Sequence, residues 1–293
     1  MSAHVHATAV LQPTLLPIGV ADVPIAEIGD SRYAVRYALT SDELDAVLRL
    51  RFEVFNLELG EGLAESFETG RDEDAFDAVC RHLMVVERST GAVVGTYRLQ
   101  TSAMASTGRG FYTAGEYDLG NVPRDVLDDA VELGRACIAR EHRNTRVLFL
   151  LWKGLAAYVA HNGKRYLFGC CSLTSQDPEE GARVAAWLSK NGHVETAFAL
   201  TAKRGFECRV SGENGAEEQR DGAADGTADV GDDEDVRVPP LFGIYLRYGA
   251  KVCGAPALDR AFGTIDFPVM LDAHALSATA SAAFFGAEGA PRR

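Results

Sequence analysis

The sequence predicts an α/β (α+β) fold in which a mixed central β-sheet is flanked by helices. Segments with the alternating pattern of strands and segments with the period of helices follow one another as strand, helix, hairpin, strand, helix and strand. The chain has 293 residues, of which 47% are hydrophobic, and this is enough for a sizeable core. No apolar run reaches the roughly 18 residues that cross a bilayer. We therefore expect one globular domain over residues 31–272.

The domain is expected to begin with a strand over residues 33–39, where apolar and polar residues alternate. Thr40 or Ser41 then caps a helix that ends at Phe55, since the apolar residues after the cap recur at helical spacing. Residues 57–76 are rich in glycine and acids. They predict a long ordered loop, which in a compact domain is usually functional.

The middle of the chain contains a hairpin and a strand–helix–strand unit. A Ser-Thr-Gly turn joins the hairpin strands, and the later helix is long and amphipathic. The predicted elements are strands over 83–87, 92–99, 131–138 and 166–171 and a helix over 145–162.

The last part of the domain is predicted to hold two helices and a strand. Pro178 opens a helix to about residue 190, a second helix follows Pro240 and runs to residue 251, and residues 263–271 form a strand.

The charge of the chain is concentrated in one segment. The net charge is −13, and residues 211–238 hold ten acids against two arginines. Their Gly/Asp/Glu-rich composition predicts a disordered insertion. Residues 1–30 are expected to form a flexible leader, and residues 273–293 a C-terminal tail. Because a basic footprint is missing, we expect no nucleic-acid partner.

The sequence gives no sign of a metal site or a bound cofactor. The six cysteines are scattered without a C-x-x-C pair, and the P-loop, dinucleotide, serine-hydrolase and zincin motifs are absent. The start of the chain has no secretory signal pattern, which predicts a cytoplasmic protein.

Glu132 and Arg135 interrupt an apolar strand, where charges are costly unless they are paired or used. Three positions apart, they would point to opposite faces of a regular strand, but a bulge near Gly134 would bring both to one side. They are candidate catalytic residues. The alternatives are a structural ion pair or an edge strand.

Other charged residues lie near this strand in the sequence. Asp74 and Asp77 suit a cationic ligand, although acidic loops are usually only solvated. Arg51 and Arg98 lie among apolar residues, where arginines often only form ion pairs or extend to solvent. A basic stretch after the strand would complement an anionic partner, or is ordinary surface charge. Its residues are Arg135, Arg140, His142, Arg143, Arg146 and Lys153.

Several motifs occur in a fixed order along the chain. They include Leu50-Arg-Phe-Glu-Val-Phe55, Asp74-Ala-Phe-Asp77, Gly95-Thr-Tyr-Arg-Leu99, Glu132-Leu-Gly-Arg135, Leu167-Phe-Gly-Cys-Cys-Ser172, Gly249-Ala-Lys-Val-Cys-Gly254 and Thr264-Ile-Asp-Phe267. This set resembles the ornithine–acyl-carrier N-acyltransferases of the acetyltransferase-like (GNAT) superfamily. The resemblance covers residues 33–210 and 239–272. It implies a GNAT-like fold and transfer of a (3-hydroxy)fatty acyl group from acyl carrier protein to the α-amino group of L-ornithine.

The N-terminal half is also similar to the acyl-homoserine lactone synthases. Their cleft is formed by an arginine and a phenylalanine on the first helix, a D-x-x-D pair, a strand arginine and an E-x-x-R strand. These fall on Arg51, Phe55, Asp74, Asp77, Arg98, Glu132 and Arg135. The tryptophan of those synthases is missing, which disfavours the lactone reaction. The glycine-rich pyrophosphate loop of CoA-dependent relatives is also not evident, which favours the phosphopantetheine thioester of an acyl carrier protein as co-substrate.

The implied reaction is attack of an amine on a thioester. Because an α-amino group is mostly protonated at neutral pH, a base is needed, and Glu132 is the candidate. Asp74 and Asp77 either hold the side-chain ammonium of ornithine or order the loop through arginines. The carrier protein, or its phosphate, would bind at Arg140, Arg143 and Arg146.

Three alternatives stay open. One is a different acceptor, such as glycine or another amino acid. Another is signal synthesis of the acyl-homoserine-lactone type. The third is a non-catalytic, membrane-perturbing protein, against which the Glu132/Arg135 pair argues. The amphiphilic product also leaves room for peripheral contact with the inner face of the cytoplasmic membrane.

Overall fold

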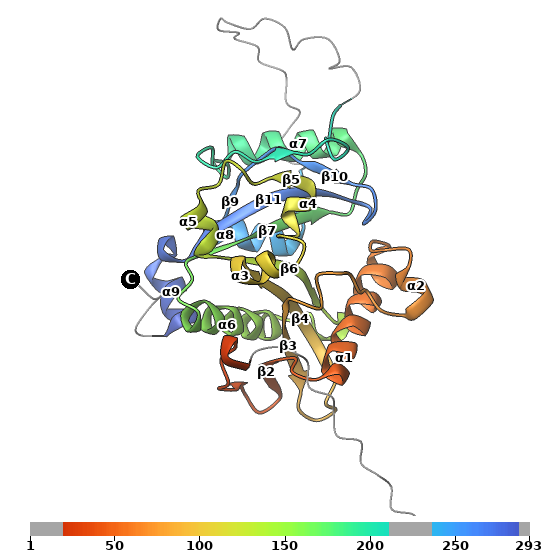
Figure 1. Cartoon of the computed structure of the whole chain (residues 1–293), viewed down its shortest axis with the longest axis vertical. Helices are drawn as coiled ribbons and strands as arrows, with labels where there is room; N and C mark the ends of the chain where they lie inside the picture. Colours follow the sequence, from red (N-terminus) through yellow and green to blue (C-terminus); the bar gives the residue numbers. More distant parts are fainter. Residues whose placement is uncertain (1–19, 211–235, 287–293) are drawn as a thin grey trace, which may run out of the picture.

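The computed structural model describes residues 20–210 and 236–286 and is built on a mixed β-sheet (Figure 1). The strand order is β1-β2-β3-β4-β6-β7-β11-β10, and β9 pairs with β11. Neighbouring strands on this path are antiparallel, except that β6 and β7 are parallel. The predicted mixed sheet with flanking helices is confirmed.

Most predicted elements are present. The strands are β1 (Ile28–Gly29), β2 (Tyr33–Tyr37), β3 (Arg81–Glu87), β4 (Val93–Thr101), β5 (Tyr117–Asp118), β6 (Ala130–Ile138), β7 (Tyr166–Leu173), β8 (Thr201–Ala202), β9 (Lys251–Val252), β10 (Ala257–Asp259) and β11 (Thr264–Asp272). The helices are η1 (Val20–Asp22), α1 (Ser41–Phe52), the π-helix η2 (Glu53–Leu59), α2 (Ser66–Thr69), α3 (Ser102–Thr107), α4 (Thr113–Glu116), α5 (Arg124–Asp128), η3 (Arg140–His142), α6 (Thr145–His161), α7 (Pro178–Lys190), α8 (Pro240–Arg247), η5 (Ala273–Ala275) and α9 (Ala278–Phe285).

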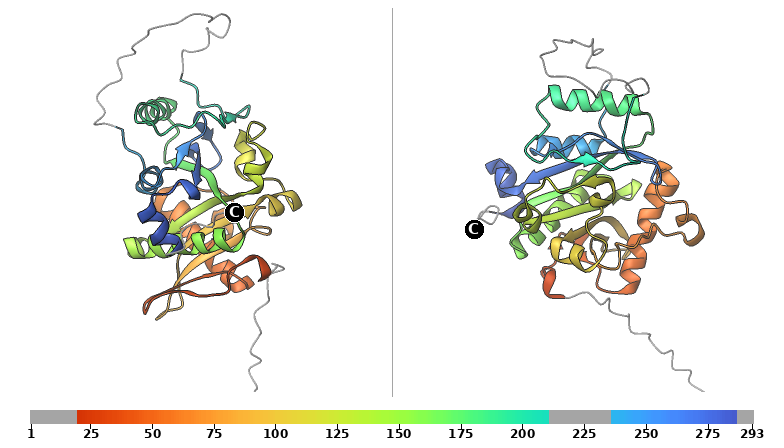
Figure 2. Two further views of the ribbon diagram at one scale, coloured as in Figure 1. Left: turned by 90° about the vertical axis from the view of Figure 1, so that its left-hand side faces the viewer. Right: turned by 45° about the horizontal axis from the view of Figure 1, so that its top comes forward.

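Two helices cover opposite faces of the first half of the sheet. Successive strand residues point to opposite faces. On β3, Leu83 and Val85 belong to the apolar cluster that contains α6, whereas Met84 and Val86 pack with Val47 of α1. The two helices also lie on different sides of these strands in Figure 2.

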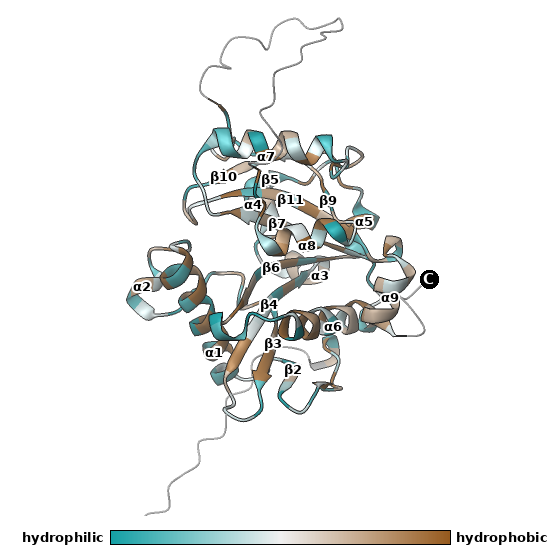
Figure 3. Ribbon diagram, turned by 180° about the vertical axis from the view of Figure 1, so that it is seen from behind, coloured by the Kyte–Doolittle hydropathy of each residue, from teal (hydrophilic) through white to brown (hydrophobic). Residues whose placement is uncertain are grey.

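The second half of the sheet has its own apolar cluster. Ile265 and Phe267 of β11 pack against Val184 and Leu188 of α7 and against Phe242 of α8. Figure 3 shows apolar residues concentrated in the strands, while α7 carries many polar residues. Among the described helices, none combines the length and apolar content needed to span a bilayer.

The capping residue predicted for α1 is confirmed. The Thr40 side chain accepts a hydrogen bond from the Glu43 N–H (3.2 Å), and the Glu43 side chain accepts one from the Thr40 N–H (3.3 Å). This reciprocal capping box satisfies two backbone donors of the first turn. It fixes where α1 begins, and therefore where Arg51 and Phe55 lie.

Two predicted boundaries are wrong. The helix after Pro240 ends at Arg247, because Gly249 adopts a left-handed backbone (φ +91°), and Lys251 starts β9. Residues 57–76 are not entirely loop, because they include the end of η2 and the short helix α2.

Parts of the predicted leader and tail belong to the fold. Val23 is buried in the main apolar cluster and β1 pairs with β2, so residues 20–30 belong to the fold. At the other end, α9 packs against α6 through Phe284 and Phe149 (ring centroids 5.9 Å apart). Residues 1–19, 211–235 and 287–293, and with them most of the predicted acidic insertion, lie outside the described residues.

Candidate active site

A cavity of about 740 Å³ lies where β6 and β7 separate. The two strands pair only along Ala130–Glu132 and Tyr166–Phe168. Beyond that, β7 passes so close to β6 that a Cβ atom on Gly169 would lie 2.2 Å from the Leu133 carbonyl oxygen. Glycine is therefore required at the point where the strands diverge.

The cavity has a polar end and an apolar end. Charged and polar side chains from β4, β6, β7 and β11, together with Glu61, line the first, and apolar side chains from α6, α8 and α9 line the second. The apolar end includes Leu151, Leu155, Ile244, Phe284 and Phe285. This arrangement suits a ligand with a polar head and a long apolar chain.

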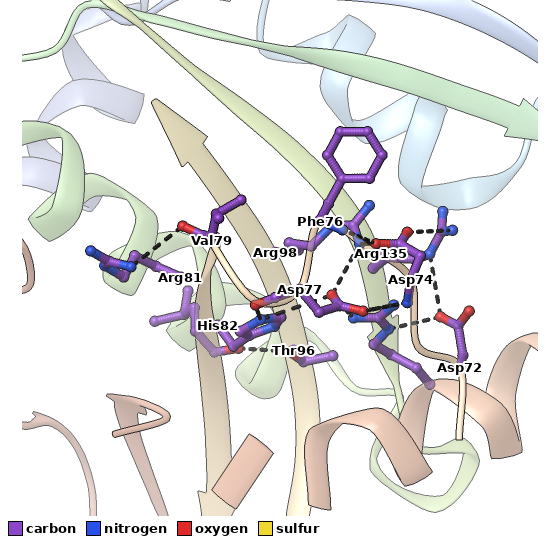
Figure 4. A network of polar contacts seen from close by, with 12 residues as sticks. Asp72, Asp74, Phe76, Asp77, Val79, Arg81, His82, Thr96, Arg98 and Arg135 are labelled. Atoms are coloured by element: carbon purple, nitrogen blue, oxygen red, sulfur yellow. Dashed lines mark hydrogen bonds and ion pairs between the residues drawn. The ribbon is translucent and has the colours of Figure 1, made fainter. Parts of the chain in front are cut away.

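An ionic network of three arginines and three aspartates borders the polar end (Figure 4). Arg51 is fully buried. Its Nε lies 2.7 Å from Asp72 Oδ2, and its Nη1 lies 2.7 Å from Asp77 Oδ1. Arg98 Nη1 donates to Asp74 Oδ1 (2.6 Å) and to Asp77 Oδ1 (3.0 Å). The network therefore joins α1, the loop before β3, and β4.

Arg135 closes this network from β6. Its Nη2 donates to Asp74 Oδ2 (3.2 Å), and its Nε lies 3.3 Å from Asp72 Oδ2. Three positive charges thus face three negative charges, which is how a buried charge cluster avoids an unpaired member. Asp74 and Asp77 contact Arg51, Arg98 and Arg135, which are the contacts expected if the two carboxylates order the loop through arginines.

The arginines determine the ionisation of Asp77. Burial alone would raise the pKa of this carboxyl, but the charges of Arg51 and Arg98 outweigh it and hold the pKa well below its usual range. Asp77 is therefore ionised at neutral pH and locked in place. Its negative charge is already balanced by Arg51 and Arg98, so a further cation would gain little from binding to it.

The bulge predicted near Gly134 is present and confirmed. Thr96 pairs with Cys137 and Arg98 with Gly134, so three steps along β6 oppose two along β4. At the bulge, Arg135 adopts a left-handed backbone conformation (φ +50°), which is uncommon for residues other than glycine. As a result, Glu132 and Arg135 both contact Tyr112, which places them on one side of the strand.

Glu132 is buried and rigidly held at the cavity wall. Its two oxygens accept hydrogen bonds from the backbone N–H groups of Tyr112 and Thr113, each at 2.7 Å. Burial raises the pKa of Glu132, although the hydrogen bonds to Thr113 and Tyr112 oppose the shift. A carboxyl with a raised pKa in a cavity is a candidate acid or base.

Phe55 reaches the cavity from the π-helical segment after α1. Its ring packs edge to face against Phe262 (5.6 Å between centroids), and the guanidinium carbon of Arg135 lies 4.4 Å from the centroid of Phe262. Four of the predicted site residues line the cavity, namely Phe55, Arg98, Glu132 and Arg135, and three others, Arg51, Asp74 and Asp77, belong to the ionic network next to it.

The three predicted donor-binding arginines lie on the surface after β6. Arg143 pairs with Glu58 (2.5 Å) and lines the cavity, and Arg146 pairs with Asp30 (2.6 Å). Arg140 is exposed on η3. Two of the three positive charges are therefore partly neutralised by acidic neighbours.

The sequence analysis missed a second group of buried carboxyls. Asp266 of β11 and Glu61 line the cavity, and Glu116 of α4 lies behind Asp266. Ligand atoms of Glu116, Cys170 and Asp266 lie within 4.8 Å of one another, so this group could hold a cation. A signal was available for Asp266, because it interrupts an apolar strand just as Glu132 does.

Comparison with known proteins identifies several that the chain resembles. The family model described as an acetyltransferase (GNAT) domain matches residues 50–153. The L-ornithine N(alpha)-acyltransferase of Rhizobium meliloti (strain 1021) is 33% identical over 80% of this chain and 78% of that protein. The protein of the same name from Brucella abortus (strain 2308) is 32% identical over 87% and 89%. The crystal structure of the AHL synthase LasI has a TM-score of 0.47 and 13% identity, over 90% of this chain and 99% of that one.

The identity and coverage are high enough to assign the family. The predicted GNAT-like fold is confirmed by the family model and the mixed sheet. The chain is an N-acyltransferase and belongs to the L-ornithine N(alpha)-acyltransferase family.

Proposed function

We propose that the chain transfers a (3-hydroxy)fatty acyl group from an acyl carrier protein to the α-amino group of L-ornithine. The observation that supports this most directly is the cavity itself. Glu132 and the β6 bulge lie at its polar end, and a long apolar extension leads away from them. A thioester bound with its carbonyl at the bulge would have its acyl chain in the extension and its carbonyl carbon near Glu132.

Glu132 is proposed as the base that removes a proton from the attacking amine. Only the neutral amine attacks, and the raised pKa of Glu132 brings the carboxyl closer to the working pH. The two backbone hydrogen bonds fix its oxygens, so the proton passes to Glu132 directly or through one water. Backbone N–H groups released from pairing at the bulge are proposed to stabilise the negatively charged oxygen of the tetrahedral intermediate.

The apolar end of the cavity is proposed to hold the acyl chain. Its walls come from α6, α8 and α9, and they are lined mainly by aliphatic and aromatic side chains. Burial of each methylene contributes about 0.8 kcal/mol. A long chain is therefore bound more tightly than an acetyl group.

The donor is proposed to dock at the exposed arginines after β6. Arg143 lies at the cavity wall, and Arg140 is exposed one turn earlier. Carrier proteins are acidic and present a phosphopantetheine phosphate, so a basic surface beside the cavity would steer them to it. Phosphopantetheine then enters as part of the co-substrate, with no cofactor held by the enzyme.

Peripheral contact of a cytoplasmic enzyme with the membrane is also proposed. Leu57, Leu59 and Phe67 are large apolar side chains with 40–61% of their area exposed on η2 and α2. Leu59 also lines the cavity. An apolar surface at the cavity would let an amphiphilic product pass into a lipid surface.

The test is an acyl-transfer assay with purified protein, ornithine, and either acyl carrier protein or CoA as donor, followed by mass spectrometry of the product. We expect N-acylornithine from the carrier-protein thioester. Glu132→Gln should lower kcat by about 10²-fold or more, since general base catalysis contributes that much. Glu141→Gln, which changes an exposed carboxyl on η3, is the matched control.

Thermal melting would establish that the Glu132→Gln variant is folded. A folded variant with wild-type kcat would rule out Glu132 as the base. Turnover with CoA thioesters at the rate of the carrier-protein thioester would argue against the proposed donor.

A further inference from the structure

The ionic network next to the cavity leaves no carboxylate free for a cationic substrate. Asp72, Asp74 and Asp77 are matched by Arg51, Arg98 and Arg135. An ammonium group placed there would have to displace a guanidinium from a buried ion pair. An amino acid with a charged side chain therefore needs another counter-charge in the cavity.

Such a counter-charge exists on the other side of the cavity. Asp266 is 4% exposed and Glu61 8% exposed, and both line the cavity wall. Within residues 20–210 and 236–286, neither carboxyl has an Arg, Lys or His nitrogen within 4.0 Å. The Glu61 side chain accepts a hydrogen bond from the Thr174 hydroxyl.

Asp266 in particular has an unused acceptor. Its Oδ1 is buried without a hydrogen-bond partner in the described part of the chain, although the side chains of Ser172, Thr264 and Glu116 lie close enough to the carboxyl to lower its pKa. Glu116 lies behind it and is 3% exposed. A buried acceptor without a donor costs free energy, and it marks a place where a ligand would supply one.

The ionisation of the group suits a cationic ligand. Burial, followed by the charges of Asp266 and Asp259, raises the pKa of Glu116, and burial also raises the pKa of Asp266 and of Glu61. Carboxyls this close take up protons when no cation is present. A bound ammonium would replace those protons.

We propose that Glu61 and Asp266, with Glu116 behind Asp266, bind the side-chain ammonium of the acceptor amino acid. This inference rests on the proposed function, because it places the α-amine of ornithine beside Glu132 and the side-chain amine of the same molecule beside Glu61 and Asp266. The α-amine must lose a proton beside Glu132. The side-chain amine keeps its charge and lies between Glu61 and Asp266, where a primary ammonium can donate three hydrogen bonds. The subsite therefore selects diamino acids over neutral ones.

The test compares L-ornithine with L-norvaline, which has the same carbon skeleton without the side-chain amine. Wild-type protein should prefer ornithine by at least about 30-fold in kcat/KM, as expected for a buried charge pair. Asp266→Asn and Glu61→Gln should each remove most of that preference by raising KM for ornithine. Their kcat/KM for norvaline should fall far less than their kcat/KM for ornithine.

Asp272→Asn is the matched control. It makes the same chemical change on the same strand, but its carboxylate pairs with Arg165 outside the cavity lining. The preference for ornithine should be unchanged in this variant. Unchanged preference in folded Asp266→Asn and Glu61→Gln as well would overturn the inference, and so would a wild type that does not distinguish ornithine from norvaline.

A binding measurement separates this inference from the proposed reaction. Ornithine, but not norvaline, should raise the melting temperature of wild-type protein, and Asp266→Asn should abolish that rise even if no acyl transfer occurs. Acylation of neither amino acid would reject the proposed function alone. A stoichiometric metal ion found by elemental analysis in wild type and lost in Asp266→Asn would overturn the ammonium assignment.

Discussion

Arg51 is fully buried between Asp72 and Asp77, and its replacement leaves both carboxylates without their nearest partner. Removing one member of a buried ion pair typically costs about 3–5 kcal/mol. We therefore expect Arg51→Met to lower the free energy of unfolding by that amount, measured by urea denaturation. The activity of the folded fraction should fall as well, because the loop that carries Asp74 loses its anchor.

Arg49→Met is the control for this prediction. Arg49 is two residues away on the same helix, but it is exposed and pairs with Asp45 at the surface. Exposed pairs contribute about 0–1 kcal/mol. Equal losses of stability in the two variants would show that the buried network does not hold α1 to the sheet.

The residues of the site differ in how far sequence could predict them. Glu132, Arg135 and Arg98 stand out because each is a charge inside an apolar strand pattern, and such charges must be paired or used. Glu61 and Glu116 carry no such signal, since one follows a glycine in a loop and the other ends a four-residue helix. Glu61 is held by Thr174, just after β7, and Glu116 lies beside Cys170 of β7 and Asp266 of β11, contacts that local sequence does not encode.

At the level of elements, α6 packs unusually close to the sheet at Gly154. A Cβ atom there would lie 2.7 Å from Leu83 Cδ1 and 2.8 Å from Val35 Cγ1. Alanine is favoured over glycine in helices by about 1 kcal/mol, but overpacking a core costs about 1–3 kcal/mol. Gly154→Ala should therefore destabilise the protein by about 1 kcal/mol, measured by thermal or urea unfolding.

Gly243→Ala should have the opposite effect on the stability of the protein. Gly243 lies inside α8, and its nearest Cβ neighbour would be Val238 Cγ2 at an ordinary 3.6 Å. Only the helix-propensity gain remains there, so this variant should be at least as stable as wild type. Stabilisation by Gly154→Ala would mean that α6 can move away from β2 and β3 at little cost.

Element length explains which parts of the fold the sequence predicted. The long helices α1, α6 and α7 have capping residues and several turns of helical hydrophobic spacing. The strands β3, β4, β6 and β11 are long enough to be recognised as strands from the sequence. The short helices α3 to α5 and the two-residue strands have too few residues for a period to emerge. The short helices α3 to α5 form where the chain between β4 and β6 packs against Phe168 and Met270, which lie far away in sequence.

The cavity is lined by residues from both halves of the sheet and from the helices that cover it, and the last described helix, α9, lies at its apolar end. Phe284 of α9 lines the cavity and packs against Trp152 of α6 (5.1 Å between centroids) and Tyr248 (5.3 Å). Under the proposed function this ring limits the length of the bound acyl chain. Phe284→Ala removes the ring and should shift the preference toward longer chains, measured as relative kcat/KM over a series of carrier-bound acyl chains of increasing length.

Phe149→Ala is the control that distinguishes loss of a ring from the cavity from loosening of the contact between α6 and α9. Phe149 packs against Phe284 on the outer side and does not line the cavity, so its loss should leave chain-length preference unchanged while loosening α9 to a similar degree. An identical shift in both variants would attribute the effect to movement of α9. If neither variant changes the preference, the acyl chain does not reach α9, and its length must be limited nearer to β6 and β7.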